Sequence, residues 1–144
     1  MQISINKVST KAVIPNRATE GSAGFDLHAC IDTPVSITPG IRVLISTGIA
    51  IEIPNNYCGM VCSRSGLASK HGIFVLNAPG IIDSDYRGEI KVILCNFGKE
   101  TVVIENGQRI AQLVIVPVAT PELRLTTQVS ETDRGTGGFG STGL

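Results

Sequence analysis

Short apolar runs recur along the whole of this 144-residue chain, and turn-forming residues separate them. The separators are Pro39-Gly40, Pro54 to Asn56, Gly98 to Glu100 and Asn106-Gly107. Many short runs with β-branched residues and with Pro, Gly and Asn between them are typical of an antiparallel β-sandwich or barrel. We expect strands at residues 3–8, 35–38, 42–53, 57–62, 74–77, 89–96, 101–104 and 110–118.

Helices contribute little to the expected fold. No window of twelve residues shows a convincing period of 3.6, and one short helix is expected at Ser65 to Lys70, with Gly72 as its C-terminal cap. The sequence therefore predicts an all-β protein, a distorted sandwich or barrel with one short helix.

Composition limits the classes of partner. Twelve basic and twelve acidic residues give a formal net charge of zero, so we expect no nucleic-acid partner. Apolar residues make up 42% of the chain and charged residues only 17%, which indicates surface buried between subunits. No run approaches the roughly 20 apolar residues of a membrane span, and no signal-type run opens the chain. We expect a cytoplasmic protein, with an organellar or nuclear location left open.

The cysteines disfavour a zinc site. Cys30, Cys58, Cys62 and Cys95 form no Cys-x-x-Cys pair, and the chain has only two histidines. We expect free thiols in a reducing compartment.

The segment from Asn77 to Gly88 carries two aspartates, a tyrosine and glycines between two apolar runs. This pattern predicts a hairpin with its turn near Ser84, which would place Asn77 opposite Lys91 and Gly80 opposite Gly88. Such a hairpin forms a cradle for a flat ligand, with an amide at its mouth and the carboxylate of Asp83 beside it. Alternatively, Asp83 and Asp85 are only turn residues.

Polar side chains elsewhere indicate an anion site. Ser63 to Ala68 combines hydroxyls and a guanidinium with a helix start, although a serine there is often only a cap. On a strand of period two, Arg109, Ala111 and Leu113 would face one way, and Gln112 the other. Asp26 lies among small and apolar residues and needs a polar partner, such as Arg64 or the outer shell of a metal ion.

The sequence changes character after Gln128. Residues 129–144 are glycine-rich and cannot bury a core, whereas residues 1–128 read as a single β domain. The tail is either a disordered end or a lid in which Arg134 contacts phosphate and Phe139 stacks on a ligand.

Taken together, five segments resemble the trimeric deoxyuridine triphosphatase (dUTPase) family. They are Ala23 to Leu27, Arg64 to Ala68, Asn77 to Gly88, Gly107 to Leu113 and Arg134 to Ser141. The resemblance implies a jelly-roll-like β fold, a homotrimer with active sites at subunit interfaces, and a C-terminal arm that closes over a neighbour's site. It implies hydrolysis of dUTP to dUMP and pyrophosphate, which limits uracil incorporation into DNA and supplies dUMP for dTMP synthesis.

The resemblance also implies residue roles. Asp83 would direct a water molecule at the α-phosphorus, with Mg²⁺ held mainly by the triphosphate and by Asp26 through water. The phosphate contacts it implies are Arg64, Ser65, Gly66, Gln112 and Arg134. The base and sugar contacts are Asn77, Gly80, Ile81, Ile82, Tyr86, Lys91, Phe139 and Gly140.

Two rival functions remain open on the same fold. One is a dCTP deaminase, although no matching acid–base glutamate stands beside the hairpin and the zinc deaminase signature is absent. The other is a non-catalytic nucleotide-binding relative. The sequence also leaves open whether Arg109 is structural or functional.

Overall fold

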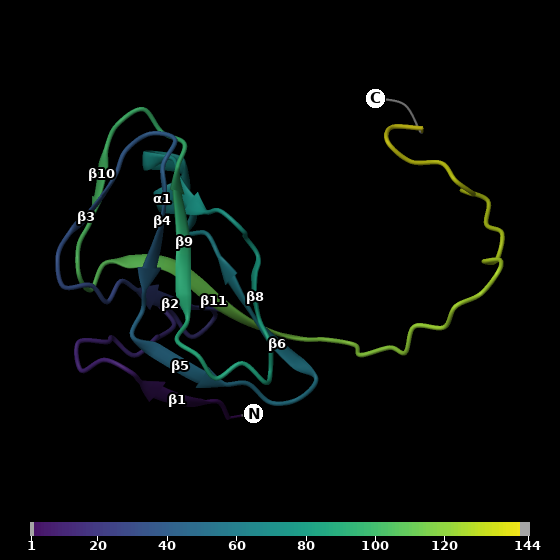
Figure 1. Ribbon diagram of the computed structural model, residues 1–144, viewed down its shortest axis with the longest axis horizontal. Coiled ribbons are helices and arrows are strands. Elements are labelled where there is room, and N and C mark those ends of the chain that lie inside the picture. Colours follow the sequence, from purple (N-terminus) through teal and green to yellow (C-terminus); the bar gives the residue numbers. More distant parts are fainter. Residues whose placement is uncertain (1, 142–144) are drawn as a thin grey trace.

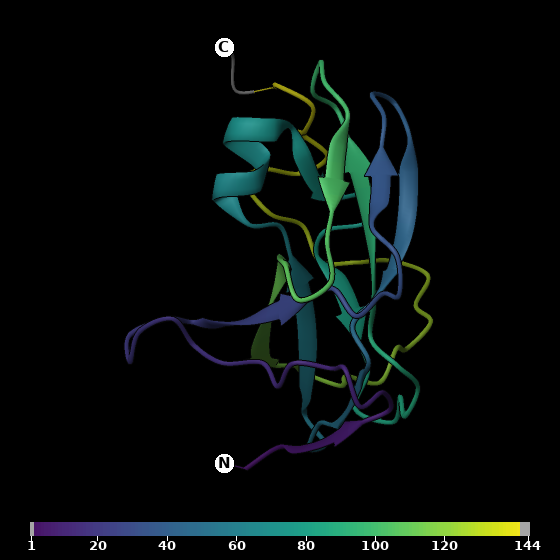
Figure 2. The ribbon, with the colours of Figure 1, turned by 90° about the vertical axis from the view of Figure 1, so that its left-hand side faces the viewer.

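The computed structural model describes residues 2–141, which form eleven strands and one short helix (Figure 1). The fold is all-β and jelly-roll-like, as the sequence predicts. Figure 2 shows the helix at one end of the body and the first strand at the other. The elements are β1 (Ser4–Lys7), β2 (Gly24–His28), β3 (Val35–Ile37), β4 (Arg42–Ser46), β5 (Ile49–Glu52), β6 (Tyr57–Cys62), α1 (Ser65–His71), β7 (Ile73–Val75), β8 (Gly80–Ile82), β9 (Lys91–Asn96), β10 (Val102–Ile104) and β11 (Arg109–Pro117).

The strands pair in four antiparallel sheets. The largest has the order β2-β11-β6-β8, a second has the order β4-β9-β7, and β1-β5 and β10-β3 form two-stranded ribbons. All four sheets contribute to one apolar core, whose burial is the main favourable term in folding. Its fully buried side chains include Leu27, Ile37, Ile45, Ile49, Ile73, Ile90, Leu94, Ile104 and Ile110.

Most predicted strands are confirmed, and β6 has the predicted bounds. The run predicted at 42–53 is two strands, because Gly48 adopts a φ of +68° and turns the chain between β4 and β5. Two strands were missed. β2 contains a glycine and an aspartate, which are depleted in strands, and β8 has only three residues. The helix and its cap at Gly72 are confirmed, and all four cysteines are free.

The predicted pairing within the hairpin is wrong. β7 does pair with β9, but Val75 lies opposite Leu94, so Asn77 does not reach the register of Lys91. Gly80 pairs with Val61 of β6 and not with Gly88. The ladder with β9 stops because the Ala78 N–H bonds back to the Val75 carbonyl (3.1 Å) and proline at 79 has no N–H to donate.

The strict alternation expected on β11 is also wrong. Ile110, Ala111 and Leu113 are all buried, and the pairing with β2 shifts between Arg109 and Ala111. This β-bulge inserts an extra residue and so changes which side chains share a face.

After β11 the chain leaves the body as an extended arm (Figure 1). Residues 119–136 are exposed throughout, and Leu123 and Leu125 are 97% and 98% exposed. The extended chain begins before the change in composition at Gln128, and the last residues of the predicted arm, 142–144, lie outside the described range. The described residues contain no helix with the length and apolarity to cross a membrane.

Candidate active site

A pocket of about 270 Å³ lies along β8. We call it the hairpin pocket, and it is lined by Val61, Asn77, Gly80, Ile81, Ile82, Asp83, Tyr86, Glu89 and Lys91. β8 is the last strand in the order of its sheet, so its outer edge has no neighbouring strand among residues 2–141. Alternate residues of an antiparallel edge strand direct both N–H and C=O outward. The pocket therefore combines free backbone donors and acceptors with one amide and one exposed carboxylate.

Two glycines fix the side chains around this pocket. A Cβ on Gly80 would lie 3.1 Å from Asn77 Nδ2, so the glycine leaves room for the amide at the pocket mouth. A Cβ on Gly88 would overlap the ring of Tyr86. The Tyr86 hydroxyl donates to the Glu89 carbonyl oxygen (3.0 Å), and the backbone N–H of Tyr86 donates to the Asp83 carbonyl oxygen (3.2 Å). The turn that carries Asp83 thus holds the tyrosine ring at the pocket.

A second group of polar side chains, the arginine cluster, consists of Asp26, Arg64 and Arg109. Asp26 Oδ1 lies 3.3 Å from Arg64 Nε, and Oδ2 lies 3.2 Å from an Arg109 terminal nitrogen. Arg64 also donates to the Arg109 carbonyl (3.2 Å). The prediction that Asp26 pairs with Arg64 is confirmed, and the second arginine on the same carboxylate was not predicted.

Gln112 adjoins this cluster. It lies on β11 between Asp26 of β2 and Cys62 of β6, and its Nε2 donates to the Ser63 carbonyl (3.0 Å). A Cβ on Gly24 would lie 2.6 Å from Gln112 Oε1, so this glycine makes room for the amide. Ser65 and Gly66 begin α1 directly after Arg64, and the first amides of a helix have no intrahelical acceptor. The predicted anion-binding side chains of the body therefore lie together.

His28 stands on the same strand as Asp26, in register with Arg109. Its Nδ1 is buried and has no hydrogen-bond partner within the described residues. Burial of the imidazole lowers the pKa of His28, with Arg109 and Arg64 acting in the same direction and Asp26 opposing them. A neutral imidazole that packs beside Asp26 fits these surroundings.

Within one chain, the hairpin pocket and the arginine cluster stand apart. The register of β6 with β8 continues from Gly59–Ile82 to place Asp83 opposite Cys58, whereas Arg64 follows the other end of β6. Six residues of strand separate these positions, which is about 20 Å at 3.3 Å per residue. One chain therefore does not bring Asp83 to the predicted phosphate contacts.

The predicted arm residues lie away from both groups. Phe139 is fully exposed, and Arg134 Nε donates to the Gly137 carbonyl (2.9 Å). Phe139 and Gly140 both have positive φ, at 50° and 88°. The arm extends away from the body (Figure 1).

Comparisons with known proteins identify the family of this chain. The family model described as dUTPase matches residues 10–143. A deoxyuridine 5'-triphosphate nucleotidohydrolase of Hydrogenobaculum sp. is 53% identical over 144 residues, covering 100% of this chain and 99% of the relative. The chain belongs to the dUTPase family. The Nautilia profundicola protein of the same name is also 53% identical, over 99% of each chain.

Solved dUTPase structures share the fold. The dUTPase of Staphylococcus bacteriophage 80alpha, solved with dUpNHpp, has a TM-score of 0.90 at 30% identity and covers 99% of each chain. A mutant dUTPase from phage phi11 of S. aureus, described with a structural Mg(II) ion, has a TM-score of 0.83 at 27% identity and covers 91% of this chain and 100% of that one.

Residues 2–141 of this dUTPase chain do not form a metal cage. Among the described residues, no group of three or more His, Cys, Asp or Glu is placed to hold a metal ion. Both oxygens of Asp26 are already engaged by guanidinium groups. A direct protein ligand set for Mg²⁺ therefore does not fit, and phosphate oxygens remain as the ligands that a hard cation prefers.

Sequence reasoning missed two residues of the pocket wall, Val61 and Glu89. Glu89 lines the hairpin pocket, and its Oε2 lies 3.6 Å from Lys91 Nζ. Residues two apart on an extended segment share a face, so the Glu89–Lys91 spacing was a signal that could have found it.

Proposed function

We propose that this chain hydrolyses dUTP to dUMP and pyrophosphate. The hairpin pocket carries this proposal, because it combines a free strand edge, the Asn77 amide and the Asp83 carboxylate in a space of about 270 Å³. Membership of the dUTPase family supports the same reaction.

The pocket suits the hydrogen-bonding edge of uracil. Uracil has a donor at N3 between acceptors at O2 and O4, and an outward residue of β8 offers one N–H and one C=O side by side. The Asn77 amide and the backbone at Lys91 supply further groups. In cytosine, two of these groups are exchanged between hydrogen-bond donor and acceptor. A site built to bond one pattern can reject the other by about 10⁴–10⁵-fold, because the polar groups of the site are then left unpaired.

Two aromatic side chains would contact the nucleoside, Tyr86 at the sugar and Phe139 at the uracil. Tyr86 lines the pocket and its ring is fixed by the bond to the Glu89 carbonyl, so it can pack against the sugar, where a ribose 2'-hydroxyl would collide. Phe139, with Gly140 beside it, can reach the uracil only from another chain, because its own arm leads away from the body.

Asp83 is the proposed general base. Its exposed carboxylate at the end of β8 can orient a water molecule toward the α-phosphorus and take the proton as the new phosphorus–oxygen bond forms. The bond to the bridging oxygen breaks, and pyrophosphate leaves. General-base assistance of this kind is typically worth about 10²–10⁴-fold.

The arginine cluster is the proposed phosphate site. Arg64, Ser65, Gly66 and Gln112 would hold the triphosphate, and Asp26 fixes the Arg64 guanidinium in place. Positioning and electrostatic stabilisation supply most of the catalysis in reactions at phosphorus. Mg²⁺ would arrive on the triphosphate and neutralise part of its charge, with Asp26 in contact through water.

A homotrimer would complete each site. Asp83 and Arg64 lie about 20 Å apart along one chain, so a single substrate needs the pocket of one subunit and the cluster of another. The exposed arm with Leu123 and Leu125 would extend over a further subunit and deliver Arg134 and Phe139. The free thiols suit a reducing cytoplasm, which is our proposed location.

A substrate panel tests the reaction. Purified chain with Mg²⁺ is given dUTP, dCTP, dTTP or UTP, and pyrophosphate and ammonia are measured. We expect pyrophosphate from dUTP alone at a substantial rate. Ammonia from dCTP would instead support a deaminase, and binding of dUTP without either product would support a non-catalytic nucleotide-binding protein.

A further inference from the structure

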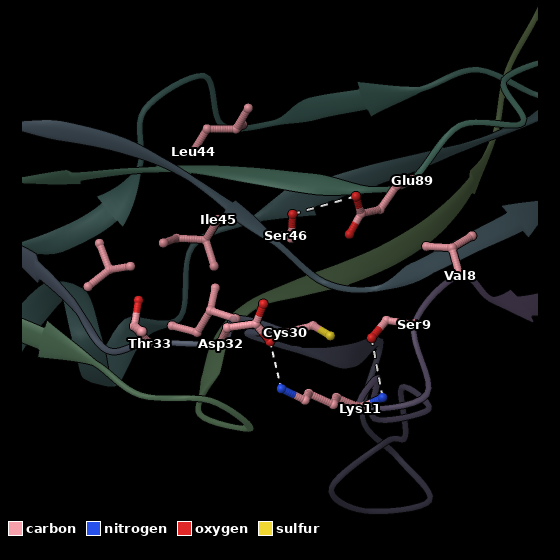
Figure 3. Close-up of a pocket in the computed structure, with 12 residues that line it drawn as sticks. Val8, Ser9, Lys11, Cys30, Asp32, Thr33, Leu44, Ile45, Ser46 and Glu89 are labelled. Atoms are coloured by element: carbon pink, nitrogen blue, oxygen red, sulfur yellow. Dashed lines mark hydrogen bonds and ion pairs between the residues drawn. The ribbon is translucent and has the colours of Figure 1, made fainter.

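The side chain of Glu89 joins the hairpin pocket to the turn between β4 and β5. Glu89 Oε1 accepts the Gly48 N–H at 2.8 Å, and Oε2 lies 3.5 Å from the Ser46 hydroxyl and 3.6 Å from Lys91 Nζ. Figure 3 shows the carboxylate directed at Ser46. The main chain of the same residue accepts the Tyr86 hydroxyl at 3.0 Å.

Gly48 is a rigid partner for this carboxylate. Its φ is +68°, and a Cβ there would lie 2.7 Å from Cys30 Sγ and 2.8 Å from Ala12 Cβ. Its carbonyl accepts the Val8 N–H at 2.8 Å. The Gly48 N–H is therefore held by close packing on one side and by the N-terminal segment on the other, so Glu89 is tied to a fixed point.

The anchoring of β9 does not depend on this carboxylate. The next residue, Ile90, is buried, its N–H donates to the Ile49 carbonyl (2.9 Å) and its own carbonyl accepts the Thr47 hydroxyl (2.5 Å). These bonds hold the strand to the body without the Glu89 side chain. What the carboxylate adds is the placement of the residues on either side of it, Tyr86 through the Glu89 main chain and Lys91 through the ion pair.

We propose that Glu89 is a positioning residue that sets the Tyr86 ring and so determines selectivity for deoxyribose over ribose. This inference rests on the proposed function, in which the ring packs against the sugar. The carbonyl that accepts the Tyr86 hydroxyl is held in two ways, by the bond of the Ile90 N–H in the same peptide plane to the Ile49 carbonyl and by the side-chain bond of Glu89 to Gly48. Without the carboxylate only the main-chain bond is left, and the Tyr86 ring can shift away from the sugar. A ribose 2'-hydroxyl then meets less steric resistance.

The test compares Glu89 with a second glutamate, Glu52. Both contact the loop that follows β8, Glu89 at Tyr86 and Glu52 at Arg87. Glu89→Ala removes the tie to Gly48, and Glu89→Gln keeps an amide oxygen that can accept the Gly48 N–H. Glu52→Ala is the matched control, because Glu52 reaches the loop through an exposed ion pair with Arg87 at 3.7 Å. For each variant, kcat and KM are measured for dUTP and UTP with Mg²⁺, together with the Tm.

We expect Glu89→Ala to lower the ratio of kcat/KM for dUTP over UTP by about tenfold, the typical effect of losing a hydrogen bond to a charged group. The change should fall mainly on KM, with a lower KM for UTP and a higher KM for dUTP, because the ring contacts the bound sugar before and during reaction. Glu89→Gln should keep most of the selectivity, and Glu52→Ala should match the wild type.

A double-mutant cycle with Tyr86→Phe separates positioning from general loosening. Phenylalanine keeps the ring but lacks the hydroxyl that bonds to the Glu89 carbonyl, so Glu89→Ala should reduce selectivity little further in this background. Unchanged selectivity in Glu89→Ala, within about twofold, or an equal loss in both backgrounds would overturn the inference. A wild-type chain that releases no pyrophosphate from dUTP would overturn the proposed function itself, which the same assay reports separately.

Discussion

The hairpin pocket and the arginine cluster are built in different ways. The pocket depends on main-chain groups at the free edge of β8, with glycines at 80 and 88 that leave room for Asn77 and Tyr86. The cluster depends on side chains, with one carboxylate, Asp26, holding two guanidinium groups. Backbone geometry suits recognition of a base edge, whereas paired arginines suit a mobile, highly charged triphosphate.

The two regions also differ in what they lack. The pocket has the carboxylate for a general base but no arginine among its lining residues, and the cluster has the arginines but lies about 20 Å of strand away from Asp83. In the proposed function, recognition of the uracil is therefore local to one chain, whereas the chemistry at phosphorus requires a second chain.

The largest expected effect comes from the pocket. Asp83→Asn should leave the affinity for dUTP near normal, because the amide keeps the size of the side chain, while turnover falls by at least about 10²-fold. Stopped assays of pyrophosphate release and equilibrium binding of dUTP to the variant measure the two quantities. Wild-type turnover in this variant would remove Asp83 from the mechanism.

Deletion of residues 132–144 should remove most of the activity, by about 10²-fold, while the oligomer persists. None of its described residues, 132–141, belongs to the apolar core, and the segment carries Arg134 and Phe139. Light scattering gives the mass of the truncated protein, and pyrophosphate release gives its rate. A truncated protein that falls to monomers would make the arm a structural strap instead.

Asp26→Asn tests the cluster. The amide cannot compensate two guanidinium charges, so Arg64 should lose its fixed position and kcat/KM for dUTP should fall about tenfold. Steady-state kinetics at several Mg²⁺ concentrations measure the change. Kinetics equal to wild type would show that Arg64 does not need this partner.

The smallest effects come from a matched pair of glycine variants. Gly80→Ala would press on the Asn77 amide, and Gly24→Ala would press on the Gln112 amide. We expect Gly80→Ala to raise KM about threefold with little change in kcat, and Gly24→Ala to lower kcat by a similar factor. The same kinetic effect from both variants would contradict the division between base recognition and phosphate chemistry.

The sequence predicted the fold class well because its turns carry strong local signals. The cap at Gly72 and the strand β6 follow from local residue types. β8 could not be predicted, because its partner is β6 and not the strand next in sequence, and three residues beside a proline carry little strand signal. The β11 bulge is likewise a matter of non-local pairing.

The site, like the fold, could be predicted where the signal was local and could not where it depended on non-local strand pairing. Asp26 was expected to need a polar partner because a carboxylate among apolar residues needs one, with Arg64 or the outer shell of a metal ion as the alternatives, and the structure pairs it with Arg64. That Arg109 shares this carboxylate depends on β2 and β11 being neighbours, which no local pattern shows. The separation of Asp83 from Arg64 follows from the register of β6 with β8 and is invisible in the linear motif order.

Subunit complementation tests the central claim, that each active site takes its general base, Asp83, and its phosphate-binding arginine, Arg64, from different chains. Asp83→Asn and Arg64→Ala chains, each inactive alone, are mixed in equal amounts, unfolded and refolded together. In a random closed assembly one site in four receives an intact Asp83 and an intact Arg64, so activity should return to about a quarter of the wild-type value. A mixture that exchanges subunits, as shown by tags on the two chains, yet remains as inactive as its parents would contradict the account.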